Sequence, residues 1–112
     1  MSDDDLPEVT TEEAIAAAAA GTILVDVREQ DEWNTVHATG ARLVPLSELQ
    51  QRVAELPEDS QFLVICQSGG RSARATAFLR REGFDAVNVA GGTSAWQAVG
   101  GPVVTGSVAA QA

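Results

Sequence analysis

A single cysteine, Cys66, is present in the 112-residue chain, so no internal disulfide can form. One cysteine and one histidine, His37, supply too few ligands for a metal site, and we expect neither a metal nor a cofactor. A lone thiol suits a reducing compartment, and the acidic residues 1–8 lack the basic start and apolar run of a secretory signal. These absences predict a cytoplasmic protein whose one thiol is either a packing residue or a nucleophile.

Lysine is absent, and seven arginines against 16 acidic residues leave a formal net charge of −9. A domain this acidic is repelled by phosphate backbones and anionic lipids, so we expect no nucleic-acid or membrane partner. The longest apolar run, the alanine-rich residues 14–20, is too short to span a bilayer. With 45% hydrophobic and 21% charged residues, the composition is typical of a folded globular domain.

The length fits one compact domain. We expect a disordered acidic tail over residues 1–7, a folded domain over 8–104 and a flexible tail over 105–112. Short apolar segments predict strands at 22–27, 41–44, 61–65 and 86–89. Amphipathic or capped segments predict helices at 11–20, 47–56, 71–82 and 94–99. Strands that alternate with helices predict an α/β fold in which helices cover both faces of a parallel sheet.

Two of these helices are predicted to begin at capping boxes. Thr10 followed by Glu13 has the required spacing, and so has Ser47 followed by Gln50. In each pair the first side chain is expected to accept a hydrogen bond from the backbone three residues later.

The candidate active site is the loop that follows the strand at 61–65, because ligands of open α/β sheets bind beyond the carboxyl ends of the strands. Its glycines allow successive N–H groups to point inward, and the following helix adds the positive end of its dipole. Such surroundings lower a cysteine pKa from about 8.5 to roughly 3.5–7.5, which favours the thiolate. We therefore interpret the cysteine as a nucleophile rather than a small buried hydrophobe. The nucleophile is Cys66, and the binding loop comprises Gln67, Ser68, Gly69, Gly70, Arg71 and Ser72.

Several residues outside the loop could have either a structural or a functional role. The His37 ring is expected to hydrogen-bond to the backbone in a turn; the alternative is that it acts as a general base. Arg28 and Glu32 are interpreted as an ion pair that anchors the segment after the first long strand. Trp33 and Trp96 are expected in the core, although either could wall a pocket.

Two charged residues remain candidates for lining the site. Asp26 lies at the carboxyl end of its strand, and its side chain either faces the site or caps local backbone groups. Arg74, one helical turn beyond the loop, could steer a charged substrate. Arg71 is expected to supply fixed positive charge to the loop itself.

Three ordered motifs resemble those of single-domain rhodaneses. They are D-V-R-E at 26–29, the loop at 66–72 and N-V-A-G-G at 88–92, and the likeness extends from about residue 9 to 104. The resemblance implies a five-stranded parallel sheet and a sulfurtransferase that carries sulfur as a persulfide on Cys66. It also implies that the amides of 67–71 cradle this sulfur. The implied partners are a small sulfur donor, such as thiosulfate or a persulfide, and a thiol or protein acceptor, with the chain acting as a monomer.

Two other functions are possible on the same fold. A non-catalytic docking module is one, although such modules often lose the cysteine or the loop glycines. A small thiol phosphatase or arsenate reductase is the other, but these relatives have five residues between cysteine and arginine, where this chain has four. The chain also departs from the family in its neutral Gln67, which makes thiosulfate a mediocre donor, and in Val36, which replaces the usual glycine.

Overall fold

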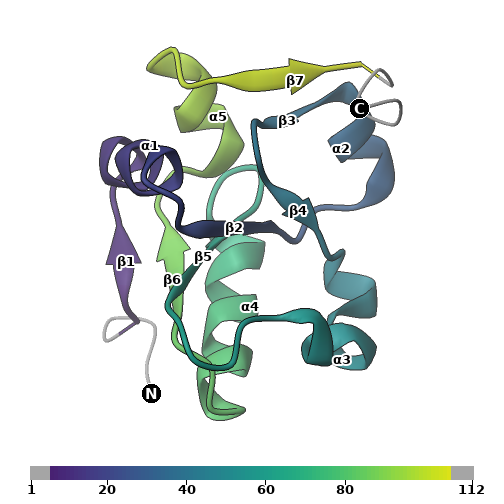
Figure 1. Cartoon of the computed structure of the whole chain (residues 1–112). Coiled ribbons are helices and arrows are strands. Elements are labelled where there is room, and N and C mark those ends of the chain that lie inside the picture. The colour runs from purple at the N-terminus through teal and green to yellow at the C-terminus, as the bar shows by residue number, and fades with distance from the viewer. Residues whose placement is uncertain (1–5, 107–112) are drawn as a thin grey trace.

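The computed structural model describes residues 6–106, and Figure 1 shows their arrangement. The strands are β1 (Glu8–Val9), β2 (Ile23–Asp26), β3 (Val36–Ala38), β4 (Arg42–Leu43), β5 (Phe62–Ile65), β6 (Ala86–Val89) and β7 (Val103–Thr105). The helices are α1 (Thr11–Ala19), α2 (Gln30–Thr35), α3 (Leu49–Arg52), α4 (Gly70–Arg81) and α5 (Gly92–Ala98). None of the helices among these residues is both long enough and apolar enough to cross a membrane.

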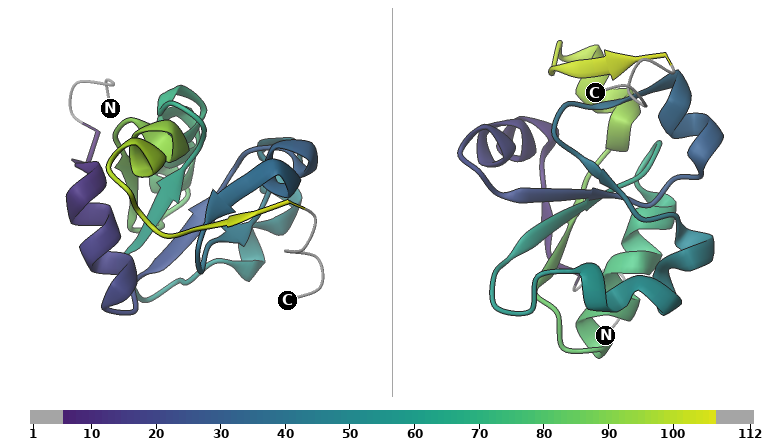
Figure 2. Two further views of the ribbon diagram at one scale, coloured as in Figure 1. Left: turned by 90° about the horizontal axis from the view of Figure 1, so that it is seen from above. Right: turned by 45° about the vertical axis from the view of Figure 1, so that its right-hand side comes forward.

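Five parallel strands form the central sheet in the order β1-β6-β5-β2-β4. This confirms the predicted α/β class and the parallel sheet. A second, two-stranded sheet pairs β3 with β7 in antiparallel register, with His37 opposite Val104. In Figure 1 and in the right view of Figure 2 this ribbon lies at one end of the molecule, beside α5.

Helices cover both faces of the sheet, because successive side chains of each buried strand point to opposite sides. Phe62 and Val64 of β5 pack in a cluster with Ala75 and Leu79 of α4. Leu63 and Ile65 belong to the second cluster, which Ala14 of α1 and Trp96 of α5 complete. The uninterrupted apolar runs of β2 and β5 are thus explained by burial on both sides.

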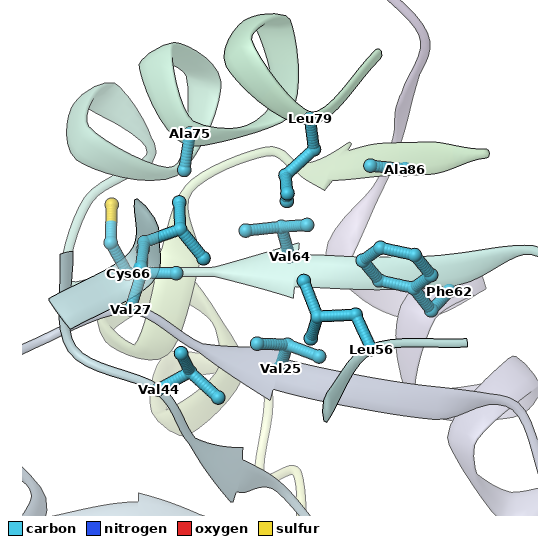
Figure 3. Packing of buried hydrophobic residues seen from close by; sticks show 11 residues of the cluster. Val25, Val27, Val44, Leu56, Phe62, Val64, Cys66, Ala75, Leu79 and Ala86 are labelled. Carbon is cyan, nitrogen blue, oxygen red and sulfur yellow. The ribbon is translucent and has the colours of Figure 1, made fainter. Parts of the chain in front are cut away.

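The same alternation places Cys66 on the α4 side of the sheet. It follows β5 directly, and its sulfur lies at the end of the first cluster, near Ala75 (Figure 3). The carboxyl ends of β2 and β6 flank this position in the sheet, so the segments after β2, β5 and β6 meet there.

The predicted boundaries agree with the observed ones to within one or two residues for β2, β4, β5, β6, α1, α4 and α5. The capping box of Thr10 and Glu13 is also confirmed: each side chain accepts a hydrogen bond from the other residue's backbone N–H, at 3.1 and 2.8 Å respectively. The prediction missed α2 because none of its residues is fully buried, so it shows no apolar periodicity. It also missed β1, β3 and β7, which are two or three residues long.

The helix predicted at 47–56 is wrong in form. This segment consists of a 3₁₀ turn (Leu46–Glu48), the four-residue α3 and a second 3₁₀ turn (Val53–Glu55). Ser47 makes no cap, since its hydroxyl donates instead to Glu29 at 2.8 Å. The hydrogen bond from Ser47 to the distant Glu29 thus takes the place of the predicted local capping box with Gln50.

The expected tails fall largely outside the described residues, at 1–5 and 107–112. Of the remainder, the Pro7 carbonyl accepts a hydrogen bond from the Asn88 N–H at 2.9 Å. At the other end β7 continues through Thr105, and the Gly106 N–H donates to the Thr35 carbonyl at 2.9 Å.

Candidate active site

The loop between β5 and α4 surrounds the Cys66 sulfur with hydrogen-bond donors. The Gly69 N–H donates to Sγ at 3.1 Å, and the Ser72 hydroxyl donates to it at 3.2 Å. Gly69 has φ of 109°, a left-handed conformation that favours glycine and leads the chain into α4. The sulfur therefore lies at the N-terminus of a 12-residue helix, whose dipole favours negative charge there.

These contacts favour the thiolate. Burial raises the pKa of the Cys66 thiol, because the residue is only 1% exposed. Hydrogen bonds from the Ser72 hydroxyl and from the N–H groups of Ser72, Gly69 and Ser68 lower it by more, so the pKa lies below its usual value. A larger fraction of this sulfur is thus ionised near neutral pH than in an ordinary cysteine, and the thiolate is the nucleophilic form.

The first residues of α5 hydrogen-bond to the backbone of the loop. The Thr93 N–H and hydroxyl both donate to the Cys66 carbonyl, at 2.8 and 3.1 Å, and the Ser94 N–H donates to the Gln67 carbonyl at 3.0 Å. Gly92 makes this approach possible, since a Cβ there would lie 2.4 Å from the Cys66 carbonyl oxygen. The loop carbonyls are consequently bonded to α5, which leaves the loop amides free to face the sulfur.

The Gln67 side chain forms a bridge across the site. Its Oε1 accepts from Arg28 Nη1 at 3.0 Å, and its Nε2 donates to the Ser94 hydroxyl at 2.7 Å. Gln67 therefore contributes its backbone to the loop, while its side chain ties together the segments after β2, β5 and β6.

Arg28, at one end of this bridge, also belongs to a buried ion pair with Asp26. Arg28 and Asp26 are 1% and 0% exposed, and the Arg28 Nη2 lies 2.9 Å from Asp26 Oδ2. The Arg28 N–H also donates to Asp26 Oδ1 at 2.9 Å, so the expected local cap by Asp26 is present. Beside the pair is a pocket of about 240 Å³ lined by Arg28, Glu32, Thr35, Val36 and Gln67.

The predicted ion pair between Arg28 and Glu32 is wrong. Glu32 instead binds Arg71 in a two-point ion pair, with N–O distances of 2.7 and 2.8 Å. The Glu29 N–H also donates to Glu32 Oε1 at 3.2 Å, which helps to fix this carboxylate on α2. Arg71 is therefore charged as expected, but its charge is balanced by Glu32.

His37 and Trp33 form a stacked pair outside the sulfur loop. Their ring centroids are 3.5 Å apart and their planes differ by 4°. His37 Nδ1 lies 3.0 Å from the Trp33 carbonyl, which agrees with the structural role predicted for this histidine. Trp96 is buried as predicted, but Trp33 is only half-buried and belongs to neither core cluster.

The structure brings together only part of the predicted loop set. Cys66, Gly69 and Ser72 converge on the sulfur, joined by the Ser68 backbone. The Ser68 side chain is exposed, and the space beside Gly70 is open. Arg74 lines a separate apolar groove with Leu46, Leu49, Gln50, Ala75 and Phe78.

Sequence reasoning missed the residues at the start of α5 that support the loop. Gly92 was noticed only as part of a motif, while Thr93 and Ser94 were given no role. The available signal was a G-G-T-S sequence directly after a buried strand, at the same sheet edge as Cys66.

The profile of the rhodanese-like domain matches residues 10–99. The chain belongs to the rhodanese-like domain family. It is 43% identical over 76 residues to "Probable adenylyltransferase/sulfurtransferase MoeZ" of Mycobacterium tuberculosis, a match that covers 65% of this chain and 19% of that protein. The rhodanese-like chain thus corresponds to about a fifth of the length of MoeZ.

Two further relatives match over most of their own length. A protein of Allochromatium vinosum named "Sulfurtransferase" is 35% identical, and the match covers 73% of this chain and 78% of the relative. The crystal structure of a rhodanese-related protein from Thermoplasma volcanium superposes with a TM-score of 0.82 at 33% identity, covering 88% of this chain and 97% of that one. Family and fold are therefore established together.

Proposed function

We propose that this chain is a sulfurtransferase in which the Cys66 thiolate accepts a sulfane sulfur and holds it as a persulfide. The observation that supports this most directly is the pair of hydrogen bonds to Sγ, from the Gly69 N–H and the Ser72 hydroxyl. Donors fixed around one sulfur stabilise negative charge on it, both as a thiolate and as a persulfide. The sulfurtransferase relatives of the chain support the same reaction class.

The proposed reaction has two steps. With thiosulfate as the donor, the Cys66 thiolate attacks the outer sulfur, the S–S bond of thiosulfate breaks, and sulfite leaves with the bonding electron pair. Cys66 then carries a persulfide anion. An acceptor such as cyanide attacks the outer sulfur of the persulfide, which releases thiocyanate and restores the thiolate.

An external acceptor is required for the second step. Cys66 is the only cysteine of the chain, so no second thiol of the same chain can resolve the persulfide. We propose that a small thiol or a partner protein takes the sulfur. A reducing compartment preserves the thiolate between turnovers, and we therefore place the reaction in the cytoplasm.

Intact-protein mass spectrometry tests this function. After exposure to thiosulfate or a persulfide donor, the wild-type protein is expected to gain one sulfur atom, located on Cys66 by peptide mapping. Cyanide is expected to remove it and yield thiocyanate. The variant Cys66→Ala should fold normally and gain no sulfur, whereas retention of wild-type transfer in this variant would rule out the proposal.

The same variant separates the other two functions. A docking module would gain no sulfur even as wild type. A thiol phosphatase or arsenate reductase would turn over an aryl phosphate or arsenate, and this activity would disappear in Cys66→Ser.

A further inference from the structure

Arg71 of the sulfur loop and Arg28, which contacts the loop, are each neutralised by their own carboxylate. Arg28 is paired with Asp26 in the interior, and Arg71 is paired with Glu32 across the gap between α4 and α2. Gln67, the loop residue that contacts Arg28, is neutral. The loop therefore offers amide and hydroxyl donors to an incoming molecule, but its nearby positive charges are balanced.

The pair of Glu32 and Arg71 differs from the buried pair because it borders the pocket and is partly open to solvent. Their side chains are 29% and 31% exposed, and Glu32 lines the 240 Å³ pocket together with Gln67. Hydrogen bonds from Arg71 lower the pKa of Glu32 to about 2, so this carboxylate stays ionised throughout the neutral range. An anionic donor that approaches the loop therefore meets an Arg71 whose positive charge is already balanced by this carboxylate.

We propose that Glu32 determines the sulfur donor by holding Arg71 in an ion pair, and that it thereby favours singly charged sulfane donors over the thiosulfate dianion. This inference rests on the proposed function and adds the class of donor to it. The donors concerned are organic thiosulfonates and persulfides, which carry at most one negative charge on the transferring group. The net charge of −9 over the chain acts in the same direction.

Methanethiosulfonate is a suitable probe because it differs from thiosulfate by a methyl group in place of one charged oxygen. The Cys66 thiolate attacks its outer sulfur, the S–S bond breaks, and methanesulfinate leaves with the electron pair. The persulfide formed is the same as with thiosulfate, so the two donors differ in their charge at the first step.

The variant Glu32→Gln removes the carboxylate charge and retains an oxygen that can accept from the Glu29 N–H. A fixed charge repels a dianion with twice the energy with which it repels a monoanion. The factor by which kcat/KM rises for thiosulfate should therefore be the square of the factor for methanethiosulfonate. With a separation on the order of 8 Å in water, kcat/KM is expected to rise roughly fivefold for thiosulfate and roughly twofold for methanethiosulfonate. Added salt should reduce both gains.

Glu55→Gln provides a matched control. Glu55 also forms a two-point ion pair with an arginine, with both distances to Arg52 at 2.8 Å, but neither residue lines the pocket. The net charge of the protein changes equally in both variants. Glu55→Gln should therefore leave the ratio of the two donors as in wild type.

The decisive measurement is kcat/KM for both donors, with cyanide as the acceptor, in wild type and in the two variants. A rise in the thiosulfate-to-methanethiosulfonate ratio in Glu32→Gln alone supports the inference, and a misfolded variant would lose both activities instead. An unchanged ratio, or an equal rise in Glu55→Gln, overturns it while the sulfurtransferase function stands. Failure of the wild type to form a persulfide with either donor would overturn both.

Discussion

The close approach of Gly92 to the Cys66 loop leads to a prediction about Gly92→Ala. It separates the cost of a steric clash with the loop from the cost of the left-handed backbone conformation. In Gly92→Ala the new Cβ would lie 2.4 Å from the Cys66 carbonyl oxygen and 2.6 Å from two Gln67 backbone atoms. These are backbone atoms at the end of a central strand, so they cannot move aside as a flexible side chain would. Gly92 also has φ of 58°, which an alanine adopts at a cost.

Gly40→Ala is the matched control for this strain. Gly40 has φ of 84°, but an added Cβ there would meet no atom within 4 Å. The left-handed conformation alone should cost about 1–2 kcal/mol in both variants. Overpacking typically adds about 1–3 kcal/mol, which we expect only in Gly92→Ala.

Urea unfolding measures the two free energies of unfolding directly. We expect Gly92→Ala to lose roughly 2–5 kcal/mol and Gly40→Ala roughly 1–2 kcal/mol. Because the displaced atoms carry the sulfur loop, Gly92→Ala should also form persulfide more slowly under conditions where it remains folded. Equal destabilisation of the two variants, with an unchanged rate in Gly92→Ala, would refute the role of Gly92 as the support of the loop.

Two further predictions concern ionised groups. Arg28→Met leaves the buried Asp26 without its partner and should destabilise the fold by about 3–5 kcal/mol, whereas Arg52→Met, at a partly exposed ion pair, should cost far less in the same urea measurement. The lowered pKa of Cys66 also links stability to pH: the contribution is complete above the pKa of the unfolded thiol and is lost as the pH falls through the lower pKa of the folded state. The stability of wild type relative to Cys66→Ala should therefore increase as the pH rises through this window, and a flat difference would contradict the assignment.

Much of the central sheet could be predicted from the sequence because its strands are buried on both faces. The run F-L-V-I identified β5, and with it the position of Cys66 at the carboxyl end of a central strand. By contrast, α2 has no fully buried residue, and β7 pairs with β3 over a long sequence separation. A helix without a buried face shows no apolar periodicity in the sequence, and the pairing of two distant strands leaves no local pattern at all.

The site could be predicted only where it depends on local sequence. Gly69 and Ser72 lie within six residues of the sulfur to which they donate hydrogen bonds, so their convergence follows from the local chain. Glu32, the partner of Arg71, lies 39 residues away, and the two partners of the Gln67 side chain lie 39 and 27 residues away. Charge balance at the loop depends on these distant contacts, so the pairing of Arg71 with Glu32 could not be predicted from the local sequence.

The ionisation of the Cys66 sulfur is the central physical claim, and the pH dependence of its alkylation by iodoacetamide tests it most directly. Because Cys66 is the only cysteine, the rate reports on this thiolate alone. The account predicts a midpoint in the folded wild type below that of the same thiol in the urea-unfolded chain, and a higher midpoint in Ser72→Ala, which lacks the donor at 3.2 Å. A midpoint in the folded wild type at or above that of the unfolded chain, unchanged in Ser72→Ala, would contradict it.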